Sequence, residues 1–118
     1  MDLGIRNRVA MVAAASKGLG RAIAEALAAE GCRLSICARS VPEAVGEDGL
    51  AVACDVSKAD ELQRWYDETV ARFGQVDILV TNTGGPPAAQ FLQLTEEQWR
   101  SGVDSTLLNV VRLCRLVI

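Results

Sequence analysis

Residues 9–21, VAMVAAASKGLGR, decide the fold of this chain. An apolar run leads into a short turn that contains Gly18 and Gly20, and the turn leads directly into an alanine-rich helix. This order is typical of a phosphate-binding strand–turn–helix, because glycines let backbone N–H groups approach a pyrophosphate and a helix N-terminus carries a partial positive charge. A plain strand–helix turn that is rich in glycine has the same pattern. The segments downstream decide between these two interpretations.

The composition describes a single globular domain. The chain has 118 residues, of which 50% are hydrophobic and 23% are charged, as expected for one folded domain. Its formal net charge is −3, and its Lys and Arg residues form no basic run. Because a nucleic-acid partner requires a basic face, we expect no nucleic-acid partner.

The cysteines and the apolar segments indicate the cellular compartment. The chain has no histidine, and its cysteines form no C-x-x-C pair (Cys32, Cys37, Cys54 and Cys114). We therefore expect no metal site, and thiols that stay reduced. The N-terminus has no secretory pattern, and no apolar stretch approaches about 20 residues, because Arg112 and Arg115 interrupt the last one. We expect a cytoplasmic protein without membrane contact.

Short apolar runs alternate with amphipathic segments along the chain. Strands are predicted at residues 9–14, 33–38, 50–54 and 76–81, helices at residues 18–30 and 58–73, and a glycine and proline loop at residues 84–87. Gly31 and Gly74 are predicted to end the two helices, and Ser57 to cap the second. The buried face of the second helix is predicted to consist of Leu62, Trp65, Tyr66, Thr69 and Phe73. This alternation is typical of an α/β, Rossmann-type doubly wound parallel sheet.

The last segment is predicted to be one helix that begins with a capping box of Thr95 and Gln98. It is apolar on more than one side, with Val103, Leu107, Val110, Cys114 and Val117 on one and Leu108, Val111 and Leu116 on another. Such a helix needs cover on two sides. The second cover is either another copy, which would make a homo-oligomer through residues 103–117, or a further part of the domain.

The number of strands suggests that the domain is incomplete. Only four strands are predicted, and the chain stops inside the apolar run at residues 116–118. The fourth strand would then be an unpaired edge, which intact domains usually cover. We expect residues 1–118 to be a Rossmann half-domain that is truncated before the rest of the fold.

Three motifs give the chain a resemblance to a known family. They are AASKGLG at residues 14–20, Asp55-Val56, and Asn82-Thr83-Gly84-Gly85, which follow the first, third and fourth predicted strands. With these motifs the chain resembles the N-terminal half of a short-chain dehydrogenase/reductase, and it is similar to the 3-oxoacyl-(acyl-carrier-protein) reductases. The resemblance covers essentially the whole chain. Because ligands of open α/β sheets bind at the carboxyl ends of the strands, we expect the motifs to form one site.

Each motif has an expected role toward a dinucleotide. The turn at residues 16–20 is expected to cradle the pyrophosphate through backbone N–H groups and the Ser16 hydroxyl, and the resemblance implies that Leu19 packs against the cofactor. The Asp55 carboxylate can accept a hydrogen bond from the adenine amine, and the Val56 N–H can meet a ring nitrogen. The residues predicted to bind the cofactor are Ser16, Lys17, Gly18, Leu19, Gly20, Arg39, Asp55, Val56, Asn82, Thr83 and Gly84.

The third motif is expected to shape the ribose end of the site. The Asn82 amide can bond neighbouring backbone, while Gly84 leaves space for the adenosine ribose. Without the other motifs, an ordinary turn would explain this segment equally well.

The end of the second strand decides which cofactor is expected. A site selective for NAD has an acid about 20 residues past the glycines, where it binds the ribose 2′-hydroxyl. Here that place is Ala38, followed by Arg39. An arginine can hold a 2′-phosphate through charge-assisted bonds, and Lys17 can add a second positive charge. We therefore predict NADP(H), although solvated surface charge is the ordinary role of an isolated arginine.

One residue departs from the family pattern. The opening glycine of the family's first motif is replaced by Ala14, which tolerates positive φ poorly. The turn is therefore expected either to have negative φ at this position or to accept strain.

The residues that catalyse hydride transfer in the family are absent from this sequence. The resemblance implies a Tyr that gives a proton to the carbonyl oxygen, a Lys four residues later that lowers the pKa of that Tyr, and a Ser that orients the substrate. The only Tyr is Tyr66, and no Tyr-x-x-x-Lys occurs. The resemblance also implies an Asn in the last helix that holds a water in a proton relay. Its place falls on Thr106, with Asn109 three residues later. We predict no catalytic residue in this chain.

Together these features predict an NADP(H)-dependent oxidoreductase acting on a carbonyl or secondary-alcohol substrate, of which this chain is the cofactor-binding half. The resemblance makes 3-oxoacyl thioesters one candidate substrate class. Two alternatives belong to other classes: a non-catalytic NADP-binding or dimerisation module, and a Rossmann methyltransferase. The missing acid after the second strand disfavours the methyltransferase, because that acid would bind a ribose there too.

Overall fold

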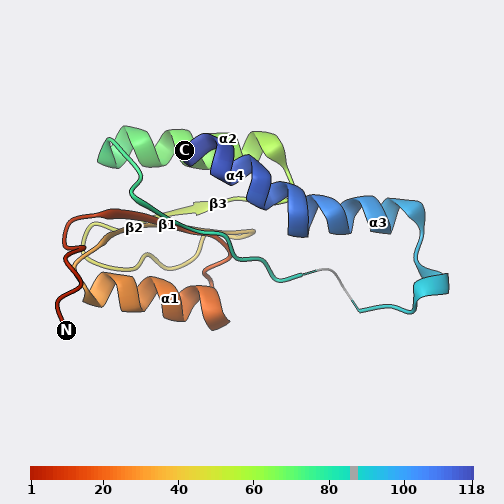
Figure 1. Cartoon of the computed structure of the whole chain (residues 1–118), viewed down its shortest axis with the longest axis horizontal. Coiled ribbons are helices and arrows are strands. Elements are labelled where there is room, and N and C mark those ends of the chain that lie inside the picture. The colour runs from red at the N-terminus through yellow and green to blue at the C-terminus, as the bar shows by residue number, and fades with distance from the viewer. Residues whose placement is uncertain (86–87) are drawn as a thin grey trace.

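The fold is a four-stranded parallel sheet with helices on both faces (Figure 1). The computed structural model describes residues 1–85 and 88–118, so Pro86 and Pro87 of the predicted loop lie outside the described residues. The strands are β1 (Val9–Val12), β2 (Arg33–Ala38), β3 (Leu50–Ala53) and β4 (Ile78–Val80), in the order β3-β2-β1-β4. Every described pairing is parallel. The predicted Rossmann-type parallel sheet is confirmed.

The helices lie in two layers. Helix α1 (Gly18–Ala29) covers one face of the sheet, and α2 (Ala59–Phe73) and α4 (Asn109–Val117) lie side by side on the other (Figure 1). Helix α3 (Glu96–Val103) extends beyond the sheet and continues into α4 through the wide π-helical turn η2 (Asp104–Leu108). A short 3-10 helix, η1 (Phe91–Gln93), precedes α3. Among the described residues, no helix is long and apolar enough to span a bilayer.

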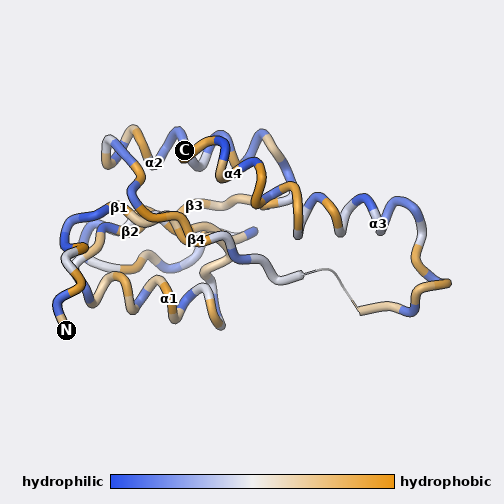
Figure 2. Tube along the Cα trace, viewed as in Figure 1, coloured by the Kyte–Doolittle hydropathy of each residue, from blue (hydrophilic) through white to orange (hydrophobic). Residues whose placement is uncertain are grey.

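Alternation along β1 supplies the core on both sides of the sheet. Ala10 and Val12 belong to the cluster beneath α1, whereas Met11 belongs to the cluster that contains Trp65 of α2 and Leu113 of α4. All the residues of β1 are buried, as expected for a parallel strand covered on both faces. Figure 2 shows the strands as the hydrophobic centre of the fold.

The predicted helix ends are largely confirmed. Gly31 and Gly74 follow α1 and α2 with φ of 89° and 85°, the left-handed conformation that glycine adopts at low cost. The capping box is also present, because Gln98 N donates to Thr95 Oγ1 at 3.2 Å and Thr95 N donates to Gln98 Oε1 at 2.9 Å. Ser57, in contrast, does not cap α2. The N-cap is Lys58, because the Ser57 hydroxyl donates to Asp55 instead.

Other predicted boundaries need correction. The first and third strands end one or two residues earlier than predicted, and the fourth both begins later and ends earlier. Single backbone bonds from Ala13 to Val80 and from Cys54 to Ala38 continue the pairing just beyond the strand ends. Of the predicted face of α2, Tyr66 is only partly buried. The predicted single last helix is divided by η2, where the Thr106 hydroxyl donates to the Gly102 carbonyl at 2.6 Å and the Asn109 amide donates to the Ser105 carbonyl.

Ala14 accepts the strain that its position imposes. Its φ is 51°, in a region that costs an L-residue roughly 1–2 kcal/mol. Its carbonyl oxygen accepts a bond from Asn82 Nδ2 at 3.2 Å, and the next N–H, of Ala15, donates to the Cys37 carbonyl at 2.9 Å. These bonds hold the turn in a conformation that alanine alone would avoid.

We expect Ala14→Gly to raise the free energy of unfolding by about 0.5–1 kcal/mol, because the strain is relieved while the unfolded chain gains some freedom. The measurement is equilibrium unfolding in urea. Ala13→Gly is the matched control, since Ala13 is buried without positive φ, and it should lower stability. A lower stability for Ala14→Gly would contradict the strain at this position.

Candidate functional site

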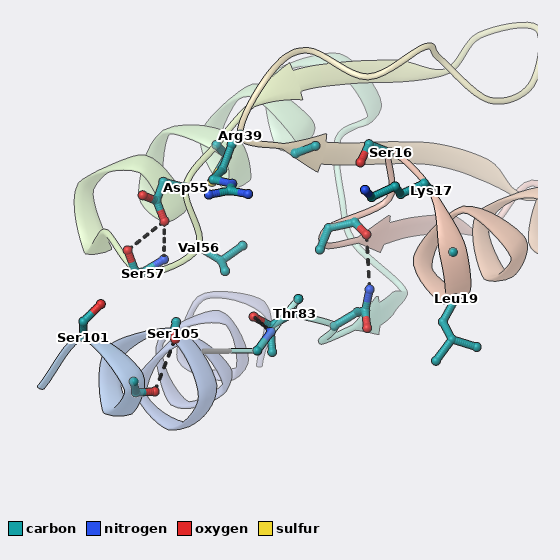
Figure 3. Close-up of a pocket in the computed structure, with 18 of the residues that line it drawn as sticks. Ser16, Lys17, Leu19, Arg39, Asp55, Val56, Ser57, Thr83, Ser101 and Ser105 are labelled. Atoms are coloured by element: carbon teal, nitrogen blue, oxygen red, sulfur yellow. Dashed lines mark hydrogen bonds between the residues drawn. The ribbon is translucent and has the colours of Figure 1, made fainter. Parts of the chain in front are cut away.

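The motifs meet in one cavity at the carboxyl ends of the strands. The cavity has a volume of about 780 Å³, and the close-up in Figure 3 shows most of its lining side chains. Of the predicted site residues, those that line it are Ser16, Lys17, Gly18, Leu19, Arg39, Asp55, Val56, Asn82, Thr83 and Gly84. Ligands of open α/β sheets occupy this edge.

Gly20 does not line the cavity, because it lies beneath the turn. A Cβ built on Gly20 would overlap the carbonyl oxygen of Ala14 and would lie 2.7 Å from Asn82 Nδ2. Asn82 in turn donates to the carbonyl oxygens of Ala13 and Ala14 at 3.3 and 3.2 Å. Gly20 is therefore required for close packing of α1 against the ends of β1 and β4. The predicted bond from Asn82 to neighbouring backbone is confirmed.

The start of α1 faces the cavity without a side-chain cap. Its N-cap is Lys17, whose side chain accepts no bond from the helix, and the first turn holds no acid. The first N–H groups of a helix lack partners within the helix and carry partial positive charge. Gly18 has φ of 62° and no atom within 4 Å of a Cβ built on it. Leu19 is 77% exposed beside it. The arrangement can accept an anion.

Asp55 forms a tight turn with Ser57. Its Oδ1 accepts from the Ser57 N–H at 3.0 Å and from the Ser57 hydroxyl at 2.7 Å. The Ser57 hydroxyl bond, opposed by burial and helped by the Ser57 N–H, Lys58 and Arg39, holds the pKa of Asp55 below its ordinary value. No hydrogen bond to Oδ2 is formed by any residue within ranges 1–85 and 88–118, so this oxygen can accept one from a ligand.

Two cations border the cavity. Arg39 follows β2 and lies at the same end of the cavity as Asp55, while Lys17 extends from the glycine turn at the other end into the cavity, in the direction of Arg39 (Figure 3). Both are exposed, and neither forms a salt bridge with another described residue. Ala38, the residue before Arg39, also lines the cavity and brings no negative charge.

The sequence did not predict one whole wall of the cavity. Ser101 and Ser105 lie across the cavity from the turn at residues 55–57 (Figure 3). The unpredicted lining residues are Ala14, Ala38, Cys54, Ser57, Gly85, Ala89, Gln98, Ser101, Gly102 and Ser105. A cluster of small polar residues at helical spacing was the available signal for this wall, and the Asp-x-Ser pattern was the signal for Ser57.

Cys54 reaches the cavity as a neutral group. The neighbouring Cys37 thiol and burial raise the pKa of the Cys54 thiol. It therefore stays protonated at neutral pH and contributes polarity without charge.

The residues considered for a proton relay lie elsewhere. Thr106 is exposed and Asn109 is 1% exposed, and neither lines the cavity. The Asn109 amide satisfies the Ser105 carbonyl, as buried amides must. Tyr66 lies on α2, outside the cavity. In the part of the chain that the structure describes, no cluster of His, Cys, Asp and Glu is suited to a metal ion.

We expect Ser57→Ala to raise the pKa of Asp55 toward its ordinary value, because the largest stabilising bond to the carboxylate is lost. The sign follows from linkage. A carboxyl group whose pKa is lower in the folded protein than in the unfolded chain stabilises the fold at pH values above its unfolded-state pKa. This stability disappears as the pH falls through its folded-state pKa. The variant should therefore lose less stability on acidification. Carboxyl carbon NMR titration measures the shift, with Ser16→Ala as the control; an unchanged Asp55 titration in Ser57→Ala would refute this assignment.

Comparisons with known proteins agree with this geometry. A family model described as short chain dehydrogenase matches residues 8–118. The 3-oxoacyl-[acyl-carrier-protein] reductase FabG of Escherichia coli (strain K12) is 30% identical over 122 residues, which cover 98% of this chain and 50% of the relative. The corresponding reductase of Staphylococcus epidermidis is 33% identical over 114 residues, covering 88% of this chain and 47% of its own. The chain thus spans about half the length of these curated relatives.

Solved structures show the same fold. The 3-ketoacyl-(acyl-carrier-protein) reductase of Brucella melitensis, complexed with NADH, has a TM-score of 0.88 at 28% identity, covering 97% of this chain and 50% of its own. L-sorbose reductase of Gluconobacter frateurii, complexed with NADPH and L-sorbose, has a TM-score of 0.87 at 28% identity, covering 99% and 48%. With its parallel sheet, its glycine turn and a family match over residues 8–118, the chain belongs to the short-chain dehydrogenase family.

Proposed function

We propose that this chain is the NADP(H)-binding half of an oxidoreductase that acts on a carbonyl or secondary-alcohol substrate. The observation that carries the proposal is that groups suited to the pyrophosphate and to the adenosine part of a dinucleotide line a single cavity. They are an uncapped helix N-terminus at one end and an ionised carboxylate at the other. The bound cofactor would supply or accept the hydride.

The residues fit the parts of the cofactor by their chemistry. The N–H groups of residues 16–20 and the Ser16 hydroxyl would hold the pyrophosphate, because the Gly18 position leaves the backbone accessible. Asp55 would accept a bond from the adenine amine and the Val56 N–H would meet a ring nitrogen. Gly84 leaves space at the ribose, beside Thr83. Leu19, exposed at the rim, would pack against the cofactor.

The positive charges support NADP(H) as the cofactor. An acid at the end of β2 would repel a 2′-phosphate, and this chain has Ala38 there instead. The exposed Arg39 and Lys17 can both contact a phosphate group that carries about two negative charges. The two related structures were determined with different cofactors, NADH in one and NADPH in the other. The choice for this chain therefore rests on its own residues.

The substrate proposal rests on the relatives. Their names describe reductases of 3-oxoacyl thioesters and of L-sorbose, so we propose a carbonyl or a secondary alcohol, with 3-oxoacyl thioesters as one class. The chain holds no Tyr-x-x-x-Lys, so the proton donor for such a reaction is not among its residues. A non-catalytic NADP-binding or dimerisation module is the second candidate, and the same absent motif favours it.

The proposal also includes the oligomeric state and the cellular location of the protein. Val103, Leu107 and Val111 are 43%, 56% and 44% exposed along α3, η2 and α4, which supports a homo-oligomer through this face. A further part of the domain would cover the same face equally well. Four free cysteines support a reducing, cytoplasmic location.

We expect Arg39→Ala to weaken NADPH binding about tenfold and to leave NADH binding unchanged, because only the 2′-phosphate loses a charged hydrogen-bond partner. Isothermal titration calorimetry of both nucleotides measures this. Arg115→Ala, an exposed arginine on α4, is the charge-matched control. If both nucleotides bind the native chain equally well and Arg39→Ala changes neither affinity, the NADP(H) assignment is wrong.

We expect the purified chain of 118 residues to transfer no hydride by itself, because it holds no Tyr-x-x-x-Lys to protonate the carbonyl oxygen. Absorbance of NADPH in the presence of a panel of ketones and 3-oxoacyl thioesters should not decrease beyond a blank. An active reductase of the family serves as the positive control. Oxidation of NADPH that depends on both chain and ketone would refute this expectation.

A further inference from the structure

Arg112 of α4 connects the last helix to the adenine end of the cavity. Its Nη1 donates to the Ser57 carbonyl at 3.3 Å, and its Nη2 pairs with Asp104 Oδ1 at 3.1 Å. The Arg112 side chain is 31% exposed and Asp104 36%, so the pair is partly shielded from solvent. Arg112 does not line the cavity. Any effect on a ligand must therefore pass through the residues that it holds.

Ser57 is the residue through which Arg112 can act. Its N–H and hydroxyl both donate to Asp55 Oδ1, while its carbonyl accepts from Arg112. The Asp55 N–H is held separately by Glu61 Oε1 at 3.0 Å. The turn at residues 55–57 is thus fixed from both ends. Figure 3 shows Ser57 beside Asp55, with Ser105 of η2 across the cavity.

The wide turn η2 brings Asp104 within reach of Arg112. The two residues are eight positions apart, and in a straight α-helix this separation corresponds to a rise of about 12 Å. Asp104 begins the π-helical turn, which has a smaller rise per residue and inserts an extra residue into the helix. The arginine side chain extends toward the helix N-terminus, as helical side chains do. The ion pair therefore depends on the irregular turn and restrains the guanidinium that bonds Ser57.

We infer that Arg112 is a positioning residue for adenine recognition: by holding the Ser57 carbonyl, it sets the direction in which Asp55 presents its free Oδ2 to the base. The inference rests on the proposed function, since it assumes an adenine nucleotide in the cavity. A carboxylate oxygen forms a strong bond only when the donor lies near its lone-pair direction. A turn released from Arg112 still closes through Asp55 and Ser57 and keeps its bond to Glu61, but its Ser57 end is no longer held by the last helix.

A purely structural tether would affect all ligands equally, so the test must report on the edge of the base that meets residues 55 and 56. Two nucleotides provide this contrast: NADPH, and its analogue with hypoxanthine, which carries a carbonyl in place of the amine and an N–H in place of the neighbouring ring acceptor. Calorimetry gives the dissociation constant of each for the same chain. The ratio of the two constants is independent of the fraction of folded protein. We expect the native chain to prefer NADPH by about tenfold, because the analogue places a carbonyl against a carboxylate.

In Arg112→Ala the preference should fall to about twofold, while Arg115→Ala keeps the native ratio. Arg112→Lys keeps one cationic donor but not the planar fork, so its ratio should lie between these values. Asp104→Asn, which removes the ion pair but not the Ser57 contact, should lower the ratio less than Arg112→Ala. Arg112→Lys and Asp104→Asn test the inference even where Arg112→Ala does not fold.

The possible outcomes distinguish a failure of this inference from a failure of the proposed function. A native ratio in both Arg112→Ala and Arg112→Lys would overturn the positioning role, even if both variants bind every nucleotide more weakly. A native chain that binds NADPH without preferring it over the analogue would overturn the role of Asp55 and the inference together. A native chain that binds neither nucleotide would contradict the proposed function itself. A reduced ratio in the Arg112 variants alone is the supporting result.

Discussion

The close approach of α1 to the end of β1 is the constraint on which the site depends. At Gly20 the helix lies so near the Ala14 carbonyl that no side chain fits between them. Asn82, from the end of β4, donates to that same carbonyl and to the one before it. One amide therefore joins the central strand, its neighbour and the glycine turn. Asn82 is partly buried, and each hydrogen bond of ordinary strength contributes about 0.5–1.5 kcal/mol, so these bonds couple the three segments to one another.

This junction also explains why strain is tolerated at Ala14. The residue has positive φ because its carbonyl must face Asn82 while the next N–H reaches the Cys37 carbonyl on β2. Two hydrogen bonds of ordinary strength contribute about 1–3 kcal/mol together, which is of the same size as the roughly 1–2 kcal/mol cost of the left-handed conformation and offsets it. Local geometry is thus imposed by bonds to two other strands. The alanine methyl is an addition that the turn can accommodate but does not require.

The sequence predicted what short-range patterns encode. Gly31, Gly74 and the Thr95–Gln98 capping box are local signals, and the structure has each where it was expected. Ser57 was wrongly predicted as the cap of α2. Its hydroxyl donates to the Asp55 carboxylate, and the N-cap position is taken by Lys58. The sign of φ at Ala14 and the division of the last helix by η2 depend on contacts across the fold. The wall of the cavity formed by α3 was missed for the same reason.

The cofactor contacts proposed for this cavity differ from catalytic contacts in how their binding energy can be used. Contacts to a pyrophosphate, an adenine or a 2′-phosphate are the same before and during hydride transfer, because none of these groups changes in the reaction. Such uniform binding lowers the dissociation constant of a cofactor without accelerating the chemical step. Acceleration requires groups that interact with the oxygen on which charge develops. The residues that line this cavity, from Arg39 and Asp55 at one end to the glycine turn at the other, are suited to affinity, to cofactor selection and to orientation. That division explains how a chain that binds a dinucleotide as proposed would still need further residues for catalysis.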